Sequence, residues 1–321
     1  MNWLGAQVDG PLVAVRAMHF AAAATSAGAL VFRAVMAEPV ARSQEAIAKA
    51  FRIQTLRVAW IGLAVSLLSG ASWLLFQAVS MSGLPFSEAA TSQVLSTVLK
   101  RTQFGQVTEI RIALAVILAA CLAYDRFPPA RGVAAAAALG LTASIAWTGH
   151  AGSTLGDLAN LHLAADALHL LTAAIWIGGL VSLSLLLTEA GRHQAVAWAA
   201  LAQAAAERFS ALGIISVGVL LASGIVNAWI LVGSFDALAI TAYGRLLMLK
   251  IVVFAVMLVF AAINRFWLTP RLGDSSRNAR RLEALRQLTR NSVIEIALGF
   301  AIFAIVGVLG TLHPAIHLVK G

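Results

Sequence analysis

Three ionisable residues in one long apolar run give the first chemical signal in this sequence. His162, Asp166 and His169 stand at positions i, i+4 and i+7, which places them on one face of an α-helix. Two imidazoles with a carboxylate between them suit a divalent metal ion, the carboxylate acting as a ligand or orienting an imidazole. At about 1.5 Å per residue the two histidines are ~10 Å apart, so each needs partners from other helices.

Further candidate ligands lie in other apolar runs. His19 stands early in the first run and His150 at the end of the fourth, and both are candidate partners for the His162–Asp166–His169 face. Weaker candidates are the soft thioethers and the histidines near the end of the chain: Met18, Met248, His313 and His317. The single cysteine, Cys121, excludes an intrachain disulfide and a thiolate metal cluster.

The composition predicts the elements that must position these side chains. Of 321 residues, 60% are hydrophobic and only 12% are charged, against roughly 25% charged in soluble domains. Each apolar run is near or above the roughly 20 residues that cross a bilayer. We therefore predict an all-α, polytopic transmembrane bundle of about eight spans, at 11–36, 54–80, 109–125, 131–149, 160–188, 208–233, 243–268 and 292–313.

Basic residues predict how the spans are oriented. They gather in alternate connections, which marks those connections as cytoplasmic: Arg42, Lys49, Arg52, Arg57, Arg126, Arg131, Arg192, Arg208, Arg271, Arg277, Arg280, Arg281, Arg286 and Arg290. Both termini are then periplasmic, and nearly all the histidines fall in the outer half. The net charge of +9 is mostly a topology signal, and it needs no nucleic-acid partner.

The rest of the chain indicates one transmembrane domain over residues 1–321. The longest outer connection, 82–108, is rich in Ser, Thr, Gly and Pro, which predicts a loop or a short surface helix. Gly178 and Gly179 are expected to permit close helix packing. The sequence contains no nucleotide-binding P-loop motif and no nucleophile–base pair, so we predict neither ATP-driven pumping nor an enzyme.

Several motifs together resemble the copper resistance protein D (CopD/PcoD) family. They are Gly149-His150, the stretch Leu161 to His169, Trp176-Ile177-Gly178-Gly179-Leu180, Arg208-Phe209-Ser210, Ser223-Gly224, Thr241 to Arg245, Leu249-Lys250, Asn264-Arg265 and Glu295. The motifs span roughly 147–312, and 205–312 is similar to the family's characteristic segment. The first 130 residues resemble the family by topology and by His19.

The resemblance implies a multi-pass protein of copper homeostasis in the bacterial inner membrane. Such a protein is expected to take copper, as Cu(I) or Cu(II), from the periplasmic side and move it toward the cytoplasm. The implied intramembrane site contains His19, His150, His162, Asp166 and His169. The lipid bilayer surrounds the protein, and a periplasmic copper-binding protein of the CopC type is the implied partner.

Two alternatives remain open at the level of sequence. In the first, His19 or His150 opposite His169 supplies axial ligands to a b-type haem in an electron-transfer protein. In the second, the chain is a copper sensor or scaffold subunit that transports nothing. The residues leave the oligomeric state open.

Overall fold

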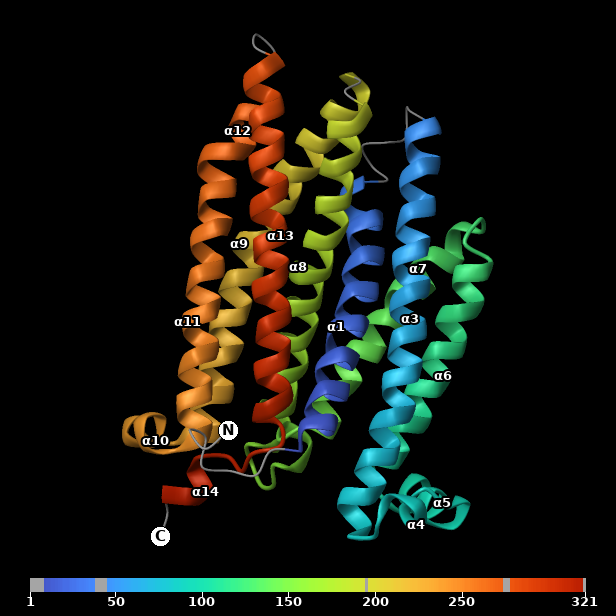
Figure 1. The fold of residues 1–321 in the computed structure, drawn as a ribbon, viewed down its shortest axis with the longest axis vertical. Helices are drawn as coiled ribbons and strands as arrows, with labels where there is room; N and C mark the ends of the chain where they lie inside the picture. Colours follow the sequence, from blue (N-terminus) through green and yellow to red (C-terminus); the bar gives the residue numbers. More distant parts are fainter. Residues whose placement is uncertain (1–8, 38–44, 194–195, 274–277, 320–321) are drawn as a thin grey trace.

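A computed structural model shows a bundle of long, nearly aligned helices (Figure 1) and describes residues 9–37, 45–193, 196–273 and 278–319. Within these ranges, eight helical segments are long and apolar enough to cross a membrane, and there is no β-strand. This confirms the prediction of an all-α, polytopic bundle with eight spans.

The spans and the short elements between them follow in chain order. The spanning helices are α1 (Gly10–Phe32) with the π-helix η2 (Arg33–Ala37), α3 (Glu45–Ser82), α6 (Gln103–Ala123), α7 (Pro128–Ala143) with the 3₁₀-helix η3 (Ser144–Thr148), α8 (Ala159–His193), α9 (Val196–Val232), α11 (Ala242–Ile263) with the π-helix η5 (Asn264–Leu268) and α12 (Thr269–Leu272), and α13 (Asn278–Leu309). The short elements are α4 (Phe86–Ala89), α5 (Ser92–Arg101), η4 (Ala151–Ser153), α10 (Phe235–Ile240) and α14 (Ile316–Val319).

The sequence predicted most of these elements. α4 and α5 form the short surface helices expected in 82–108. α3 and α13 begin well before the predicted spans at 54–80 and 292–313, because their polar first turns continue the same helix. Apolar residues define how much of a helix lies in lipid, but helix propensity lets it continue past that boundary.

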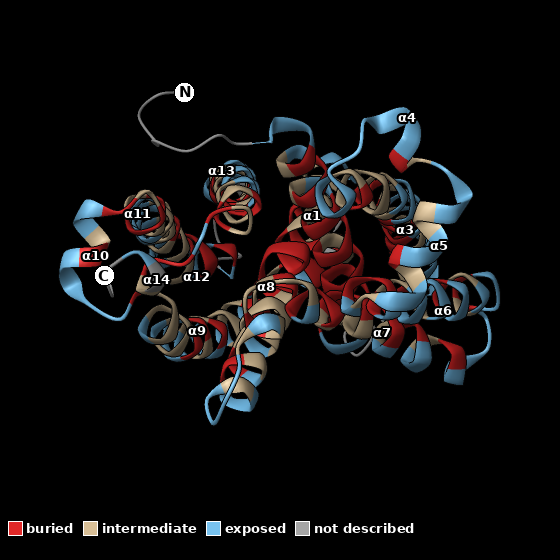
Figure 2. Cartoon of the chain, turned by 90° about the horizontal axis from the view of Figure 1, so that it is seen from below, coloured by how far each residue is buried: buried red, intermediate tan, exposed pale blue. Residues whose placement is uncertain are grey.

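Two helices form the centre of the bundle. Seen along the bundle, α1 and α8 carry most of the buried residues (Figure 2). In the apolar 18-residue stretch of each span, 72% of the residues of the first and 67% of those of α8 are buried. For α11 the corresponding share is 11%, so most of α11 is left to face lipid. α1 contacts α3, α7, α8 and α13, and it can do so because its middle is built almost entirely from alanine, serine and glycine.

Glycines set how closely these helices approach. A Cβ on Gly28 would collide with the backbone of α8 at Gly178, and a Cβ on Gly178 would collide with the backbone of α1. A Cβ on Gly62 of α3 would likewise collide with Ser26. Without these side chains the backbones come into direct contact, which is the usual basis of helix association inside a membrane. The expectation that Gly178 permits close packing agrees with this contact.

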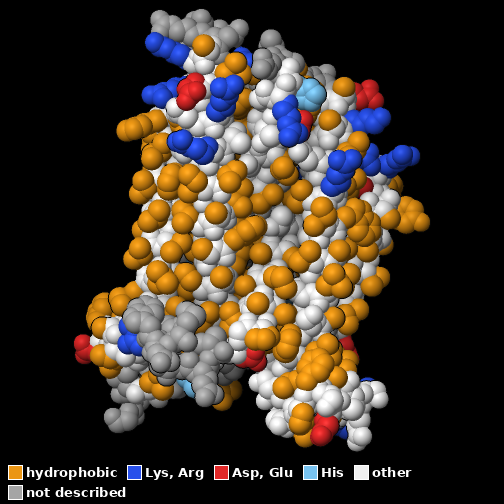
Figure 3. All heavy atoms as spheres, viewed as in Figure 1, with side chains coloured by type: hydrophobic (Ala, Val, Ile, Leu, Met, Phe, Trp, Pro, Cys, Tyr) orange, Lys and Arg blue, Asp and Glu red, His pale blue; other side chains and the backbone are white. Residues whose placement is uncertain are grey.

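The surface separates into an apolar band and a basic end. On the face that Figure 3 shows, hydrophobic side chains cover the middle of the bundle, and Lys and Arg gather at one end. The first and last described residues both lie at the opposite end (Figure 1), as an even number of spans requires. The positive-inside rule predicts that the basic end faces the cytoplasm. Below, the end opposite the basic one is called the outer end.

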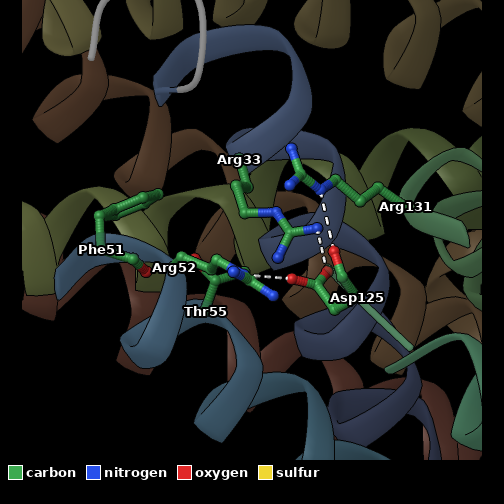
Figure 4. A network of polar contacts seen from close by, with 6 residues as sticks. All are labelled: Arg33, Phe51, Arg52, Thr55, Asp125 and Arg131. Atoms are coloured by element: carbon green, nitrogen blue, oxygen red, sulfur yellow. Dashed lines mark hydrogen bonds and ion pairs between the residues drawn. The ribbon is translucent and has the colours of Figure 1, made fainter. Parts of the chain in front are cut away.

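A buried ion cluster fastens the N-terminal helices together near the basic end (Figure 4). Asp125 follows α6 and is 2% exposed. Arg33 Nη2 donates to Oδ1 of Asp125 at 2.6 Å, and Arg52 Nε donates to Oδ2 at 2.5 Å. Arg131 Nε donates to the Asp125 carbonyl at 3.0 Å. The carboxylate of Asp125 thus ties η2 and α3 to the end of α6, and its backbone carbonyl ties α7 to the same place.

Candidate functional site

A cavity of about 360 Å³ lies in the outer half of the bundle, between α8, α9, α11 and α13. Four of the five main candidate residues line it: His150, His162, Asp166 and His169. The lining residues of α8 recur every three or four positions, as helical geometry requires, and continue inward to Trp176. The shared face predicted from the spacing of His162, Asp166 and His169 therefore faces this cavity.

His162 is held at the outer end of α8 by the connection that precedes it. Its side chain is 1% exposed. Thr154 Oγ1 donates to the His150 carbonyl at 3.0 Å, so the 2.7 Å hydrogen bond between Thr154 Oγ1 and His162 Nδ1 is donated by the imidazole. This tautomer leaves the Nε2 lone pair as the coordinating atom of His162.

His169 lies two turns deeper and is oriented by α9. Ser223 Oγ donates to the Val219 carbonyl at 2.6 Å, so His169 Nδ1 donates to Ser223 Oγ at 2.9 Å. The ring lies beside the neighbouring Gly224, where an added Cβ would stand at ordinary contact distance, 3.5 Å, from His169 Cε1. The Nε2 lone pair of His169 therefore points away from α9.

Lys250 contacts the lone pair of His169. Its Nζ lies 3.4 Å from His169 Nε2, and it reaches there from α11. No salt bridge joins Lys250 to Asp166 in the described part of the chain, although the two charges attract one another across the cavity. A metal ion on His169 Nε2 would occupy the position that the ammonium group now takes.

Asp166 is hydrogen-bonded to α9. Asn227 Nδ2 donates to Asp166 Oδ1 at 3.2 Å. The amide oxygen of Asn227 is buried and has no hydrogen-bond partner in the described part of the chain. The pair thus presents a carboxylate and an unsatisfied carbonyl oxygen to the same cavity, and both are potential ligands or water-binding groups.

His150 closes the outer end of the cavity. Its Nε2 donates to the Leu309 carbonyl at 3.1 Å, which connects the loop before α8 to the end of α13. Its ring also packs edge-on against Tyr243 at a centroid distance of 6.0 Å. The hydrogen bond makes Nδ1 the acceptor nitrogen of His150.

The fifth main candidate, His19, lies apart from this cavity. It is directed toward α3, where Nδ1 lies 3.1 Å from the Ser66 carbonyl and 3.2 Å from Ser69 Oγ. Its ring meets Trp73 at 5.5 Å, and His19 does not line the cavity. The structure therefore gives His19 a role in joining α1 to α3, and its role as a ligand stays a prediction.

The weaker candidates also lie outside the cavity lining. Met18 and Met248 are 50% and 40% exposed, and neither faces the cavity. His313 is exposed beyond the end of α13. The side chain of His317 lies outside the described residues. Among the side chains that are described, no group of three or more His, Cys, Asp or Glu is placed to hold a metal ion.

The sequence assigned no role in the site to several of its residues, although Ser223 and Tyr243 belong to the motifs that resemble the family. Thr154, Ser223 and Tyr243 orient the histidines, but a hydroxyl group in an apolar run has many roles. Arg16 of α1 also lines the cavity, and its buried Nε has no hydrogen-bond partner among the described residues. An arginine inside the membrane is a candidate functional residue because of its type alone. The sequence gave no indication of which residue would contact Arg16.

The chain resembles copper resistance proteins along most of its length. It matches the family Copper resistance protein D over residues 203–309 and the Copper resistance protein D-like N-terminal domain over residues 7–160. No solved structure matches the chain significantly.

Three relatives extend this comparison. Inner membrane protein YebZ of Escherichia coli (strain K12) is 30% identical over 94% of this chain and 98% of its own length. Copper resistance protein D of Pseudomonas syringae pv. tomato is 27% identical over 82% of this chain and 84% of its own length. Copper transport protein CutJ of Bacillus subtilis (strain 168) is 32% identical over 80% of this chain but only 45% of its own length.

These similarities and the eight apolar spans agree on the class of protein. A relative that matches end to end is named an inner membrane protein, and the length and composition of the helices fit a multi-pass protein of that membrane. The matched family consists of copper resistance membrane proteins and is not a known enzyme family. The chain belongs to the copper resistance protein D family.

Proposed function

We propose that this protein takes copper from the periplasmic side into the outer cavity and passes it toward the cytoplasm. The observation that carries this proposal is the meeting of three imidazoles and one carboxylate in one cavity at the end opposite the basic surface. Imidazole nitrogen binds copper ions of both oxidation states, and copper lies at the top of the divalent affinity series. Copper is the substrate here, and no covalent reaction is proposed.

The tautomers support a path along α8. The Nε2 lone pairs of His162 and His169 are both in or beside the cavity, one near its outer end and one two turns deeper. A copper ion could bind first near His150 and His162 and then move to Asp166 and His169. Asn227 adds an oxygen donor beside the deeper position.

Copper binding at the deeper position requires Lys250 to move. The ammonium group lies 3.4 Å from His169 Nε2, and Arg16 adds a second cation to the cavity lining. Two unit charges of equal sign at about 4 Å repel by ~4 kcal/mol at an effective dielectric constant of 20. We propose that Lys250 leaves His169 when copper arrives, so that the site is completed only in the presence of copper.

Copper binding by the purified protein tests this proposal. His162→Ala and His169→Ala should each weaken binding at least about tenfold, equivalent to ~1.4 kcal/mol, since each removes an imidazole ligand. His193→Ala is the matched control, because His193 is an exposed histidine at the far end of the same helix. Wild-type affinity in both cavity variants would contradict a site in this cavity.

Two further readouts separate the alternatives. An absorption spectrum of the same sample should lack the Soret band of a haem protein. Copper accumulation in cells should fall in His169→Ala but not in His193→Ala, whereas a sensor or scaffold would bind copper without moving it. Faster copper loading in the presence of a CopC-type periplasmic protein would support that class as the partner.

A further inference from the structure

A second cavity, of about 240 Å³, lies in the half of the bundle nearer the basic end. It is lined by α8, α9, α11, η5, α12 and α13. Trp176 lines both this inner cavity and the outer one, and its ring packs perpendicular to Phe254 at 6.0 Å. The two cavities therefore follow one another along α8, with the indole between them.

Glu295 is the central polar group of the inner cavity. Its side chain is 1% exposed, and Asn264 Nδ2 donates to its Oε1 at 2.5 Å. Asn291 Nδ2 in turn donates to Asn264 Oδ1 at 3.0 Å. Ser292, one turn from Glu295 on α13, lines the same cavity at 0% exposure, and its hydroxyl has no hydrogen-bond partner among the described residues.

The backbone of η5 places Asn264 beside Glu295. Residues Asn264–Leu268 form a π-helix between α11 and α12, and Thr269 Oγ1 donates to the Asn264 carbonyl at 2.9 Å. A π-helical turn inside a helix often marks a functional position, because it directs side chains that a regular α-helix would turn elsewhere. Here that turn supplies both the amide of Asn264 and the guanidinium of Arg265 to the inner cavity.

In the part of the chain that the structure describes, no cation is paired with Glu295. Arg265 is the other ionisable side chain among the described residues that line the cavity, and its Nη1 donates to the carbonyl and hydroxyl oxygens of Ser210, both at 2.7 Å. The helices packed against α13, namely α1, α8, α11 and α12, contribute no ionisable side chain to the described lining. An unpaired buried carboxylate costs several kcal/mol, and binding a proton or a cation removes that cost.

The donors of the inner cavity suit a proton better than copper. The described lining contains no histidine, cysteine or methionine, and its potential ligand atoms are the oxygens of the carboxylate, amide and hydroxyl groups named above. Such hard oxygen donors are poor ligands for Cu(I), which prefers sulfur and imidazole. The two cavities thus differ in chemistry, with imidazole in the outer cavity and a carboxyl group in the inner one.

We propose that Glu295 is a proton-binding site whose carboxylate takes up a proton from the cytoplasmic side and releases it to the outer cavity as copper passes Trp176 in the opposite direction. This inference rests on the proposed function for its link to copper, although proton binding itself does not. The exchange is balanced, because one carboxylate and one proton form one carboxyl group and the reverse step returns both. The proton would thereby couple copper movement to the pH gradient across the membrane.

Infrared difference spectroscopy of the purified protein tests proton binding directly. The wild type should show a pH-dependent band of a protonated carboxyl group, and ¹³C-labelling of glutamate should shift that band. The band should disappear in Glu295→Gln and remain in Asp166→Asn and in Glu283→Gln, an exposed glutamate on the same helix. A full band in Glu295→Gln, or no shift on glutamate labelling, would overturn the proposal; the labelling test needs no variant.

Copper flux into proteoliposomes tests the coupling. Flux should respond to an imposed pH gradient in wild type and in Glu283→Gln, and Glu295→Gln should lose that response while copper binding in the outer cavity persists. An undiminished response in Glu295→Gln would refute coupling through this residue. If His169→Ala binds copper normally while the Glu295 infrared band is present, the copper proposal fails and the proton site stands.

Discussion

At the scale of single residues, Lys250 occupies the Nε2 side of His169. Its ammonium group donates to Nε2, while Ser223 accepts from Nδ1, so both ring nitrogens of His169 are engaged. Asp166 nearby accepts a hydrogen bond from Asn227 and is attracted by the charge of Lys250 without a direct salt bridge. If copper binds His169 as we propose, the ammonium group of Lys250 must first be displaced.

Replacing Lys250 should strengthen copper binding. In Lys250→Met a copper ion has no ammonium group to displace from His169 Nε2, and it is repelled less as it approaches. We expect copper affinity to rise about tenfold, or ~1.4 kcal/mol, measured by titration of the purified protein. Arg245→Met is the control, since Arg245 lies one turn away on α11 and bonds the carbonyls of Ala239 and Ile240 instead. Weaker copper binding in Lys250→Met would show that the lysine assists the site.

The spacing of His162, Asp166 and His169 correctly predicted that these residues share a face, because residue spacing alone determines which side chains of one helix lie on the same face. The position of His19 could not be predicted in this way. Its contacts, Ser66, Ser69 and Trp73, lie on another helix. Which side of α1 meets which neighbour depends on interhelical packing, and an isolated histidine carries no information about that choice.

At the scale of helices, the contact between α1 and α8 forms the centre of the bundle. Gly28 and Gly178 meet there with no space for a side chain on either. The sequence suggested that Gly178 permits close packing, yet its partner could be identified only from the structure. The same contact fixes the height of the α8 histidines relative to Arg16 on α1.

A methyl group at Gly178 should therefore weaken the protein. Gly178→Ala places a Cβ against the backbone of α1, and overpacking of this kind costs about 1–3 kcal/mol. Gly218→Ala is the matched control, because a Cβ there meets nothing within 4 Å. We expect a clear loss of thermal stability in detergent for Gly178→Ala alone. Equal melting temperatures for the two variants would argue against a tight α1–α8 contact.

Asp125 should be essential to the packing of the N-terminal helices. Asp125→Asn removes the charge that Arg33 and Arg52 share, and removing one partner of a buried ion pair costs about 3–5 kcal/mol. The expected result is a large fall in thermal stability with copper affinity retained by the protein that remains folded. Glu88→Gln, an exposed change in α4, should have no effect. A stability of Asp125→Asn equal to wild type would mean that the arginines find other partners.

At the scale of the whole molecule, the proposed direction of copper movement depends on which end faces the periplasm. The apolar band and the basic end are properties of the surface (Figure 3), and the positive-inside rule relates them to the membrane. The eight spans and the gathering of basic residues at one end could be predicted, because the hydropathy and charge of a segment depend only on its own residues. The inner cavity could not, since it combines residues from six elements.

Labelling of single cysteines should establish the orientation. In a Cys121→Ser background, Ser87→Cys in α4 and Glu283→Cys in α13 place a thiol at exposed positions on opposite ends. A membrane-impermeant maleimide applied to cells with a permeabilised outer membrane should label the first and not the second. Labelling of Glu283→Cys alone would reverse the topology and the proposed direction of copper entry.

X-ray absorption spectroscopy of the copper-loaded protein tests the central claim most directly. An outer-cavity site predicts nitrogen and oxygen ligands with the outer-shell scattering typical of imidazole, and it predicts that this scattering falls in His169→Ala but not in His193→Ala. A copper environment dominated by sulfur, or one that is unchanged in His169→Ala, would contradict the account.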